Sequence, residues 1–263
     1  MAPCTRAAKA RAAAATEATC PLLDLSHDEQ SIVTHELCDP LRPLLAVHLS
    51  STAKGLWVPM QEQLAELRQR HAEVAAMAAA WGMSCAALAA ATELGLGAHP
   101  AINKPLTLAH WRTLGMLVGC GSLPELRVLG VVGDENGGEG VVSLADGLRR
   151  GRLPSLHSLF LGDVQIGPQG ASALAPALTK RALPSLGRLN LDFNPLGDAG
   201  LAALLPALRR LPKLRLLGLG QTNSGAEGVA SLVAQPTAGM WLPTNVTDTI
   251  AYSLANRTTE RMT

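Results

Sequence analysis

The sequence predicts an α/β solenoid, with parallel strands on one face and helices on the other, preceded by an α-helical amino-terminal region. Three observations support this prediction. A leucine- and proline-rich phrase recurs four times, a G-x-x-G pair follows each copy, and an apolar helical pattern comes after the pair. The equivalent residues Leu126, Leu156, Leu186 and Leu214 are separated by 30, 30 and 28 residues. Repeats of this length are typical of stacked strand–turn–helix units.

The composition narrows the class of protein. The chain has 263 residues, of which 48% are hydrophobic and 16% are charged, and its formal net charge is +1. A balanced charge argues against a nucleic-acid partner recognised through bulk basicity. No apolar run reaches the length of a membrane span, so we expect no membrane partner. The five cysteines are scattered and include no C-x-x-C pair. We therefore expect reduced thiols and a cytoplasmic protein, with the nucleus as an alternative.

The amino-terminal part divides in two. Residues 1–20 are rich in Ala and Thr with few acids, which predicts a disordered leader; an organelle transit peptide is the alternative. Residues 21–92 are expected to be helical. Ser26 and Glu29 match a capping box, a second helix is expected from near Pro43, and a third over residues 61–81. Ser84 is expected to cap a further short helix.

One repeat illustrates the expected unit. Leu189 and Leu191 alternate with polar residues, which predicts a short strand with one buried face. The Gly197–Gly200 pair allows a tight turn and close packing where a helix begins. The leucines that follow share one helix face; they are Leu201, Leu204, Leu205 and Leu208. Such a unit can bury its leucines only against neighbouring units, whose strands then pair in parallel.

The four phrases are L-P-E-L-R-V-L-G-V (123–131), L-P-S-L-H-S-L-F-L (153–161), L-P-S-L-G-R-L-N-L (183–191) and L-P-K-L-R-L-L-G-L (211–219). They resemble leucine-rich repeats of the ribonuclease-inhibitor subclass, as in NOD-like receptors and Ran GTPase-activating proteins. An eroded earlier unit is expected, with Leu94 and Leu96 on its strand and Trp111 on its helix. The resemblance implies a leucine-rich-repeat solenoid over residues 93–236, with parallel strands inside and helices outside. Residues 237–263 are expected to form an irregular tail.

The resemblance also implies a concave sheet face that binds a protein or peptide. We expect six side chains that the phase of the second and third repeats places on this inner face to contact the partner. These candidates are Phe160, Asp163, Arg188, Asn190, Asp192 and Phe193. Packing of both phenylalanines against neighbouring strands is the alternative. The family's turn-tying asparagine is present only as Asn194; Asp134, Val164 and Thr222 fill its other three places. We expect the turn at Val164 to be looser, because its side chain cannot hydrogen bond.

Residues 22–60 resemble an F-box, with a leucine-led helix, an acid–proline break, an L-L-x-x-x-L helix and a Ser–Lys–aromatic close. This resemblance implies binding to a Skp-type ubiquitin-ligase adaptor. Two departures weaken it, because Ser26 replaces the expected proline and Glu29 an expected leucine. The alternative is a helical cap that covers the apolar end of the solenoid.

No catalytic motif emerges from the sequence. It has no G-x-S-x-G elbow, no phosphate-binding loop and no complete zinc-ligand set, so we expect no cofactor, no metal and no enzymatic activity. Asp163 and Asp192 are expected near each other, but an open sheet would not supply the desolvation that tunes a catalytic pair. The predicted function is a protein-interaction scaffold. The alternatives are a ubiquitin-ligase substrate adaptor and a GTPase regulator of the Ran activator type.

Overall fold

The computed structural model describes residues 39–44, 46–48, 61–97, 106–150, 153–225 and 228. The chain divides into two compact units, residues 1–69 and 70–263, each considered by itself. The predicted leader, the capping box at Ser26 and the tail at 237–263 lie outside the described residues. In the first unit, Leu44 and residues 46–48 are helical, which agrees with a helix beginning near Pro43.

Two helices carry the helical pattern that the sequence predicts before the repeats. Helix α4 spans Gln61–Ala80, and Gly82 ends it in a left-handed conformation (φ 67°). The second helix, α5, spans Cys85–Ala89, and the Ser84 side chain accepts a hydrogen bond from the Ala87 amide at 3.1 Å. Both elements confirm the sequence expectation.

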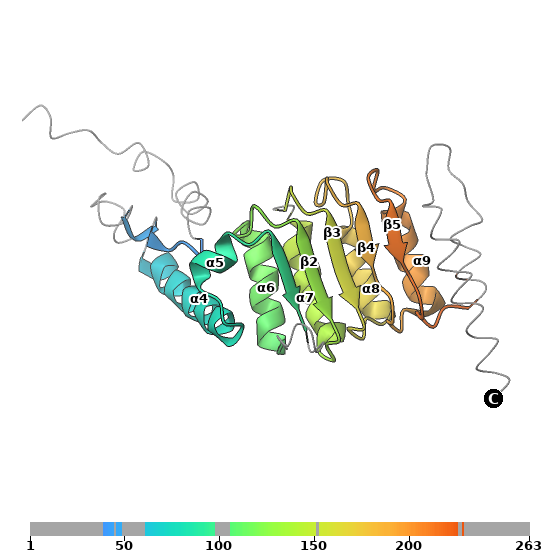
Figure 1. The fold of residues 1–263 in the computed structure, drawn as a ribbon, viewed down its shortest axis with the longest axis horizontal. Coiled ribbons are helices and arrows are strands. Elements are labelled where there is room, and N and C mark those ends of the chain that lie inside the picture. The colour runs from blue at the N-terminus through green and yellow to red at the C-terminus, as the bar shows by residue number, and fades with distance from the viewer. Residues whose placement is uncertain are drawn as a thin grey trace, which may run out of the picture. The chain divides into compact units, whose positions relative to one another are not determined.

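The described residues of the second unit form one parallel sheet of five strands in sequential order (Figure 1). The strands are β1 (Glu93–Leu96), β2 (Val128–Val132), β3 (Ser158–Gly162), β4 (Arg188–Asn190) and β5 (Leu216–Gly218). The register aligns equivalent leucines of the repeats, and all of them are buried; they are Leu94, Leu129, Leu159, Leu189 and Leu217. This arrangement confirms the predicted α/β solenoid, including the strand of the eroded unit.

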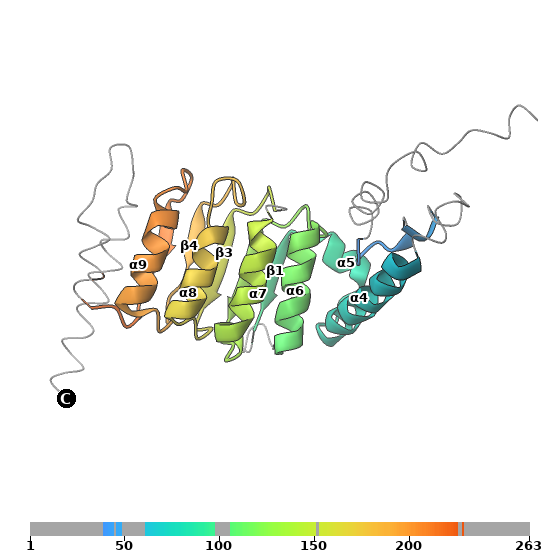
Figure 2. The ribbon, with the colours of Figure 1, turned by 180° about the vertical axis from the view of Figure 1, so that it is seen from behind.

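Helices cover one side of the sheet (Figure 2). They are α6 (Leu108–Cys120), α7 (Gly137–Arg149), α8 (Pro168–Leu174), continued by the 3-10 turn Ala175–Ala177, and α9 (Gly197–Leu208). The predicted leucine face of α9 is buried. Helices α6 and α7 approach closely, because a Cβ atom added to Gly147 would lie 2.1 Å from the Gly115 carbonyl oxygen. Glycine is therefore required at this crossing.

Buried polar side chains tie successive turns together. The Asn194 side chain is fully buried; its Oδ1 accepts from the amides of Val164 and Ile166 at 3.2 and 2.9 Å. Its Nδ2 donates to three carbonyl oxygens, the closest being that of Leu161 at 2.6 Å. These bonds bear out the tying position that the family resemblance implies. The looser turn at Val164 stays a prediction, although its amide is satisfied.

Asp134 supplies a second tie that the sequence reasoning did not anticipate. Its carboxylate is buried and accepts from the Leu106 amide at 3.1 Å, Trp111 Nε1 at 3.3 Å and the Asn136 amide at 2.8 Å. The first two donors, Leu106 and Trp111, belong to the preceding repeat. Asp134 therefore links its own turn backward, as Asn194 does, and also holds Asn136 within its own turn.

None of the described helices is both long and apolar enough to span a membrane. The thiols of Cys85 and Cys120 form no disulfide, and the other three cysteines lie outside the described residues.

Candidate binding face

In the middle row of the sheet face, two large side chains lie side by side between two glycines. Gly130 of β2 pairs with Phe160 of β3, which pairs with Asn190 of β4, which pairs with Gly218 of β5. A Cβ atom at Gly130 would lie 3.8 Å from the Phe160 Cβ atom, so the ring borders the space that this glycine leaves. Phe160 is half-buried as a result. It contributes to packing and also presents part of its ring to the exterior.

Asn190 and Asp192 form a hydrogen-bonded pair at the carboxyl end of β4. Asn190 Nδ2 donates to Asp192 Oδ2 at 2.6 Å, and the Asp192 amide donates to Asn190 Oδ1 at 3.0 Å. The other carboxylate oxygen of Asp192 accepts from the Gly220 amide at 2.6 Å. A Cβ atom at Gly218 would lie 2.8 Å from both carboxylate oxygens. The glycine at 218 therefore makes room for this polar pair.

A row of residues with left-handed backbone angles follows the strands. They lie at the position directly after Asp192 and after its equivalents in the other repeats. Gly133, Asp163, Phe193 and Gln221 have φ angles of 68°, 54°, 59° and 52°. The Phe193 amide donates to the Gly220 carbonyl at 2.8 Å, and the Asp163 amide to the Asp192 carbonyl at 2.9 Å, which places these turns side by side. Phe193 is 54% exposed. A bulky aromatic residue in this backbone region is rare and costs free energy.

Arg188 occupies the first row of the face, at the start of β4. Its register partners are Ser158 on one side and Leu216 on the other. Arg188 is exposed, and Leu216 is 39% exposed, whereas Ser158 is buried. Arg188 and Leu216 are thus exposed residues at paired positions of two neighbouring strands.

The structure brings the six predicted residues onto one continuous stretch of β3, β4 and their following turns. The phase of the repeats in the sequence places three further residues on the exposed side of this face, Gly130, Ser158 and Gly162, but the structure buries all three. Phe160 covers the first, and Asn190 approaches the third, where a Cβ atom would lie 3.3 Å from its Oδ1. Large side chains on neighbouring strands therefore leave fewer residues exposed on this face than the sequence predicts.

The arrangement offers chemistry for recognition. Phe160, Phe193 and Leu216 supply apolar surface, Arg188 supplies a cation, and Asp163 supplies a carboxylate on an exposed turn. The Asp192 carboxylate is engaged by Asn190 and the Gly220 amide. Among the described residues, no three His, Cys, Asp or Glu side chains are grouped so that they could hold a metal ion. Aromatic anchors surrounded by polar groups are typical of protein-binding surfaces.

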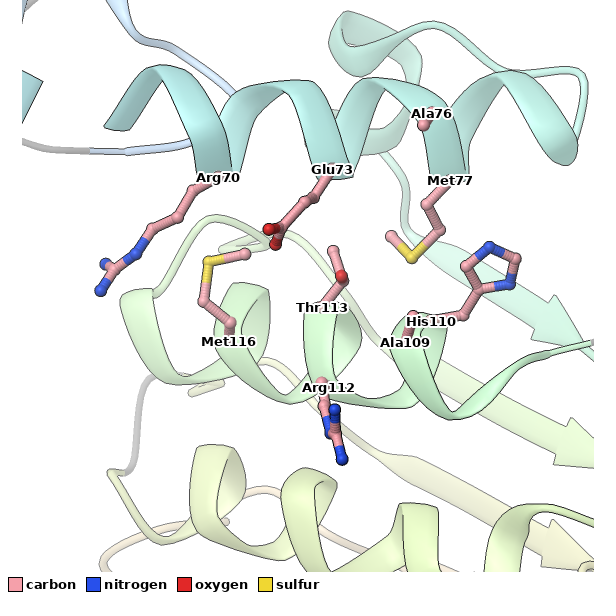
Figure 3. Close-up of a pocket in the computed structure, with 9 residues that line it drawn as sticks. All are labelled: Arg70, Glu73, Ala76, Met77, Ala109, His110, Arg112, Thr113 and Met116. Atoms are coloured by element: carbon pink, nitrogen blue, oxygen red, sulfur yellow. The ribbon is translucent and has the colours of Figure 1, made fainter. Parts of the chain in front are cut away.

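A groove elsewhere in the second unit was not indicated by the sequence. It lies between α4 and α6, has a volume of about 510 Å³, and is lined by Arg70, Glu73, Ala76, Met77, Ala109, His110, Arg112, Thr113 and Met116. In Figure 3 the Met77 and His110 side chains point toward each other, and Arg112 extends away from α4. The His110 ring also contacts Trp81 edge to face, with ring centroids 5.8 Å apart.

Comparison with family models agrees with the repeat architecture. A family model described as "Leucine Rich repeat" matches residues 182–205, which include β4 and most of α9. A search of curated protein sequences found no match. Among solved structures, the chain is similar to the actin-binding site 2 of leiomodin-1, at 18% identity and a TM-score of 0.40. That match covers 60% of this chain and 95% of the leiomodin-1 chain. With the five parallel strands, the matched repeat supports a leucine-rich-repeat protein.

Proposed function

We propose that this protein is a non-enzymatic interaction scaffold that binds a protein or peptide on the sheet face formed by β3, β4, β5 and their following turns. The repeat subclass that we assign is the ribonuclease-inhibitor type, because each unit of 28–30 residues combines a strand with a helical segment. The single observation that carries the proposal is Phe193, an exposed aromatic side chain held in a left-handed backbone conformation.

Burial of the side chain does not offset the backbone strain at Phe193, so folding alone does not account for phenylalanine at this position. Equivalent turn positions hold Gly133, Asp163 and Gln221, which are less bulky than phenylalanine at the same φ. Phe193 gains little from burial, since more than half of its surface is exposed. Residues held at unfavourable backbone angles are enriched at ligand-binding sites. A partner that covers the Phe193 ring would recover the hydrophobic free energy that folding leaves unused.

The neighbouring side chains define the partner's chemistry. Arg188 and Asp163 provide opposite charges on either side of the Phe160–Asn190 row. Recognition on this face should therefore depend on shape and a few anchors rather than on long-range attraction. We expect an apolar or aromatic partner side chain to occupy the surface between Phe160 and Phe193.

Site-directed photo-crosslinking tests this proposal. A photoreactive phenylalanine analogue replaces Phe193 in one variant and Val142 in a matched control, since Val142 is also exposed (42%) but lies on helix α7. We expect the variant at 193 to crosslink a discrete protein in a cell extract, and competition by the unmodified protein to abolish the product. Crosslinks of equal yield and identity from both positions would contradict the assigned face.

A second candidate function is a substrate adaptor of a ubiquitin ligase. It is favoured by the exposure of two apolar helical residues in the F-box-like segment, Leu44 (66%) and Val47 (37%). Co-purification of the full chain with a Skp-type adaptor tests it. We expect Leu44→Asp with Val47→Asp to abolish the complex, while Phe193→Asn leaves it intact; absence of complex with the unmodified chain would remove this candidate.

A further inference from the structure

Charges in the later repeats, after β3, are separated by their position in the repeat. One edge of the second unit consists of the segments that lead from each helix to the next strand. A pair of adjacent basic residues lies at or just beyond the end of each of three helical segments, those of α7, α8 and α9, and the six are Arg149, Arg150, Lys180, Arg181, Arg209 and Arg210. We call this set the basic edge. Lys213 and Arg215 extend it toward β5.

The acids of the later repeats lie at the other edge. Between residues 164 and 226 the sequence contains two acids, Asp192 and Asp198. Asp192 follows β4, and Asp198 lies in the first turn of α9, so both lie at the edge where strands lead into helices. The net charge of +1 for the whole chain thus conceals a local separation of charge.

Backbone hydrogen bonds bring the basic segments together. The His157 amide donates to the Arg127 carbonyl, the Gly187 amide to the His157 carbonyl and the Arg215 amide to the Gly187 carbonyl, each at 2.8 Å. This ladder joins the same point of successive repeats, immediately before each strand. The pairs at 180–181 and 209–210 precede neighbouring rungs of the ladder and are therefore close in space.

The helix macrodipole accounts for only part of this pattern. Cations stabilise the last turn of a helix, and the effect declines beyond that turn. Arg149 lies in the last turn of α7, and it also forms an ion pair with Asp146 at 3.3 Å. Lys180, Arg181 and Arg210 lie in the turns beyond the helical segments and are exposed. Their positive charges are therefore available to a ligand.

We propose that the basic edge binds an acidic segment of a polypeptide partner. Neighbouring helices stand about 10 Å apart, so three pairs extend over roughly 20 Å, which an extended chain of about six residues spans. The described residues of this edge include no Phe, Tyr or Trp on which the bases of single-stranded nucleic acid could stack. Arg188 lies on the sheet face beside this edge, so a polypeptide bound there can continue onto the basic pairs.

The choice of a polypeptide as the ligand rests on the proposed function of the sheet face. The separation of charge between the two edges does not depend on that proposal. Binding is tested with a fluorescein-labelled oligoglutamate peptide and the full chain, by fluorescence anisotropy at low and at physiological salt. The test variant is Arg181→Glu with Arg210→Glu. The control, Arg68→Glu with Arg112→Glu, changes the same formal charge at exposed residues of α4 and α6.

We expect the unmodified chain to bind the peptide, the test variant to bind about tenfold more weakly, and the control to bind within about twofold of the unmodified chain. Phe193→Asn should leave peptide binding unchanged, so this result does not depend on the sheet-face proposal. Equal weakening by the test and control variants, or no binding by the unmodified chain, would overturn the proposal. So would tighter binding of oligouridylate, or of phosphatidylserine vesicles, than of the peptide.

Discussion

Phe160 and Asn190 are register partners on adjacent parallel strands, and each is flanked on its outer side by a glycine of the next strand. Their side chains therefore stand next to each other with space on both sides, at Gly130 and at Gly218. The Phe160 ring uses part of the first space, and the Asn190–Asp192 pair occupies the second. This relationship decides which substitutions on the face should alter binding and which should alter folding.

Replacing Phe160 should separate its packing role from its binding role. Phe160 is half-buried, whereas its strand neighbour Leu189 is fully buried in the core. We expect Leu189→Ala to lower the free energy of unfolding by about 2–5 kcal/mol. Phe160→Ala should lower it by less than about half of that amount, because part of the ring is already hydrated. Urea denaturation measures both, and equal losses would identify Phe160 as a core residue.

Gly218→Ala should disturb the polar pair on the sheet face. The new Cβ atom would lie within 2.9 Å of Asp192 and Asn190 side-chain atoms, so these side chains must move and their mutual hydrogen bonds must break. We expect a loss of about 1 kcal/mol of stability, the contribution of a typical net hydrogen bond.

Gly167→Ala is the matched control for this substitution. Gly167 has extended backbone angles, and no atom would lie within 4 Å of its Cβ. Its thermal unfolding temperature should stay within about 2 °C of that of the unmodified protein. If Gly167→Ala and Gly218→Ala lower the stability equally, the cost comes from replacing glycine and not from displacing the Asn190–Asp192 pair.

Asn194→Ala should be the most damaging single change at a turn. It removes two acceptor contacts to the amides of Val164 and Ile166, and it leaves these buried donors unsatisfied. We expect a loss of about 2–4 kcal/mol by chemical denaturation, since each buried unpaired donor costs about 1–3 kcal/mol. Thr222 holds the same place in the next repeat, and its hydroxyl hydrogen bonds to the Leu219 carbonyl and to Ser224 Oγ, both in its own repeat. Thr222→Val should therefore cost about 1 kcal/mol; a cost as large as that of Asn194→Ala would contradict this ranking.

The repeat phase made the fold predictable. The spacing of Leu126, Leu156, Leu186 and Leu214 aligned all four strands, and the faint unit at Leu94 and Leu96 also formed its strand. Side-chain ties between repeats were harder to anticipate. Asp134 departs from the family's asparagine, yet its carboxylate accepts the same kind of backward hydrogen bond. The side-chain oxygens of aspartate and asparagine accept hydrogen bonds in the same geometry, so Asp134 can take the role of the family's asparagine although the residue type differs.

The candidate site was predictable in position and less so in detail. Alternation along the strands placed Phe160, Arg188 and Asn190 on one face, and the register confirms that they are neighbours. The burial of Ser158, Gly130 and Gly162 depends on how far the adjacent side chains lean across the sheet, which alternation does not encode. The groove between α4 and α6 depends on the spacing of two helices, and the sequence carries no periodic signal for that distance.

Phe193→Asn should stabilise the fold while it weakens the partner complex. Asparagine adopts left-handed backbone angles at a lower cost than phenylalanine, so the φ of 59° at this position becomes less unfavourable. The exposed ring contributes little burial that could offset this gain. We expect the free energy of unfolding to rise by up to about 1 kcal/mol, measured by urea denaturation, while crosslinking through a photoreactive group placed at Phe160 decreases.

Gln221→Asn is the control, because Gln221 has φ 52° in the equivalent turn and is exposed but not aromatic. That variant should gain similar stability and retain the crosslink. If Phe193→Asn instead loses stability, the ring stabilises the folded chain and its exposure does not indicate a partner.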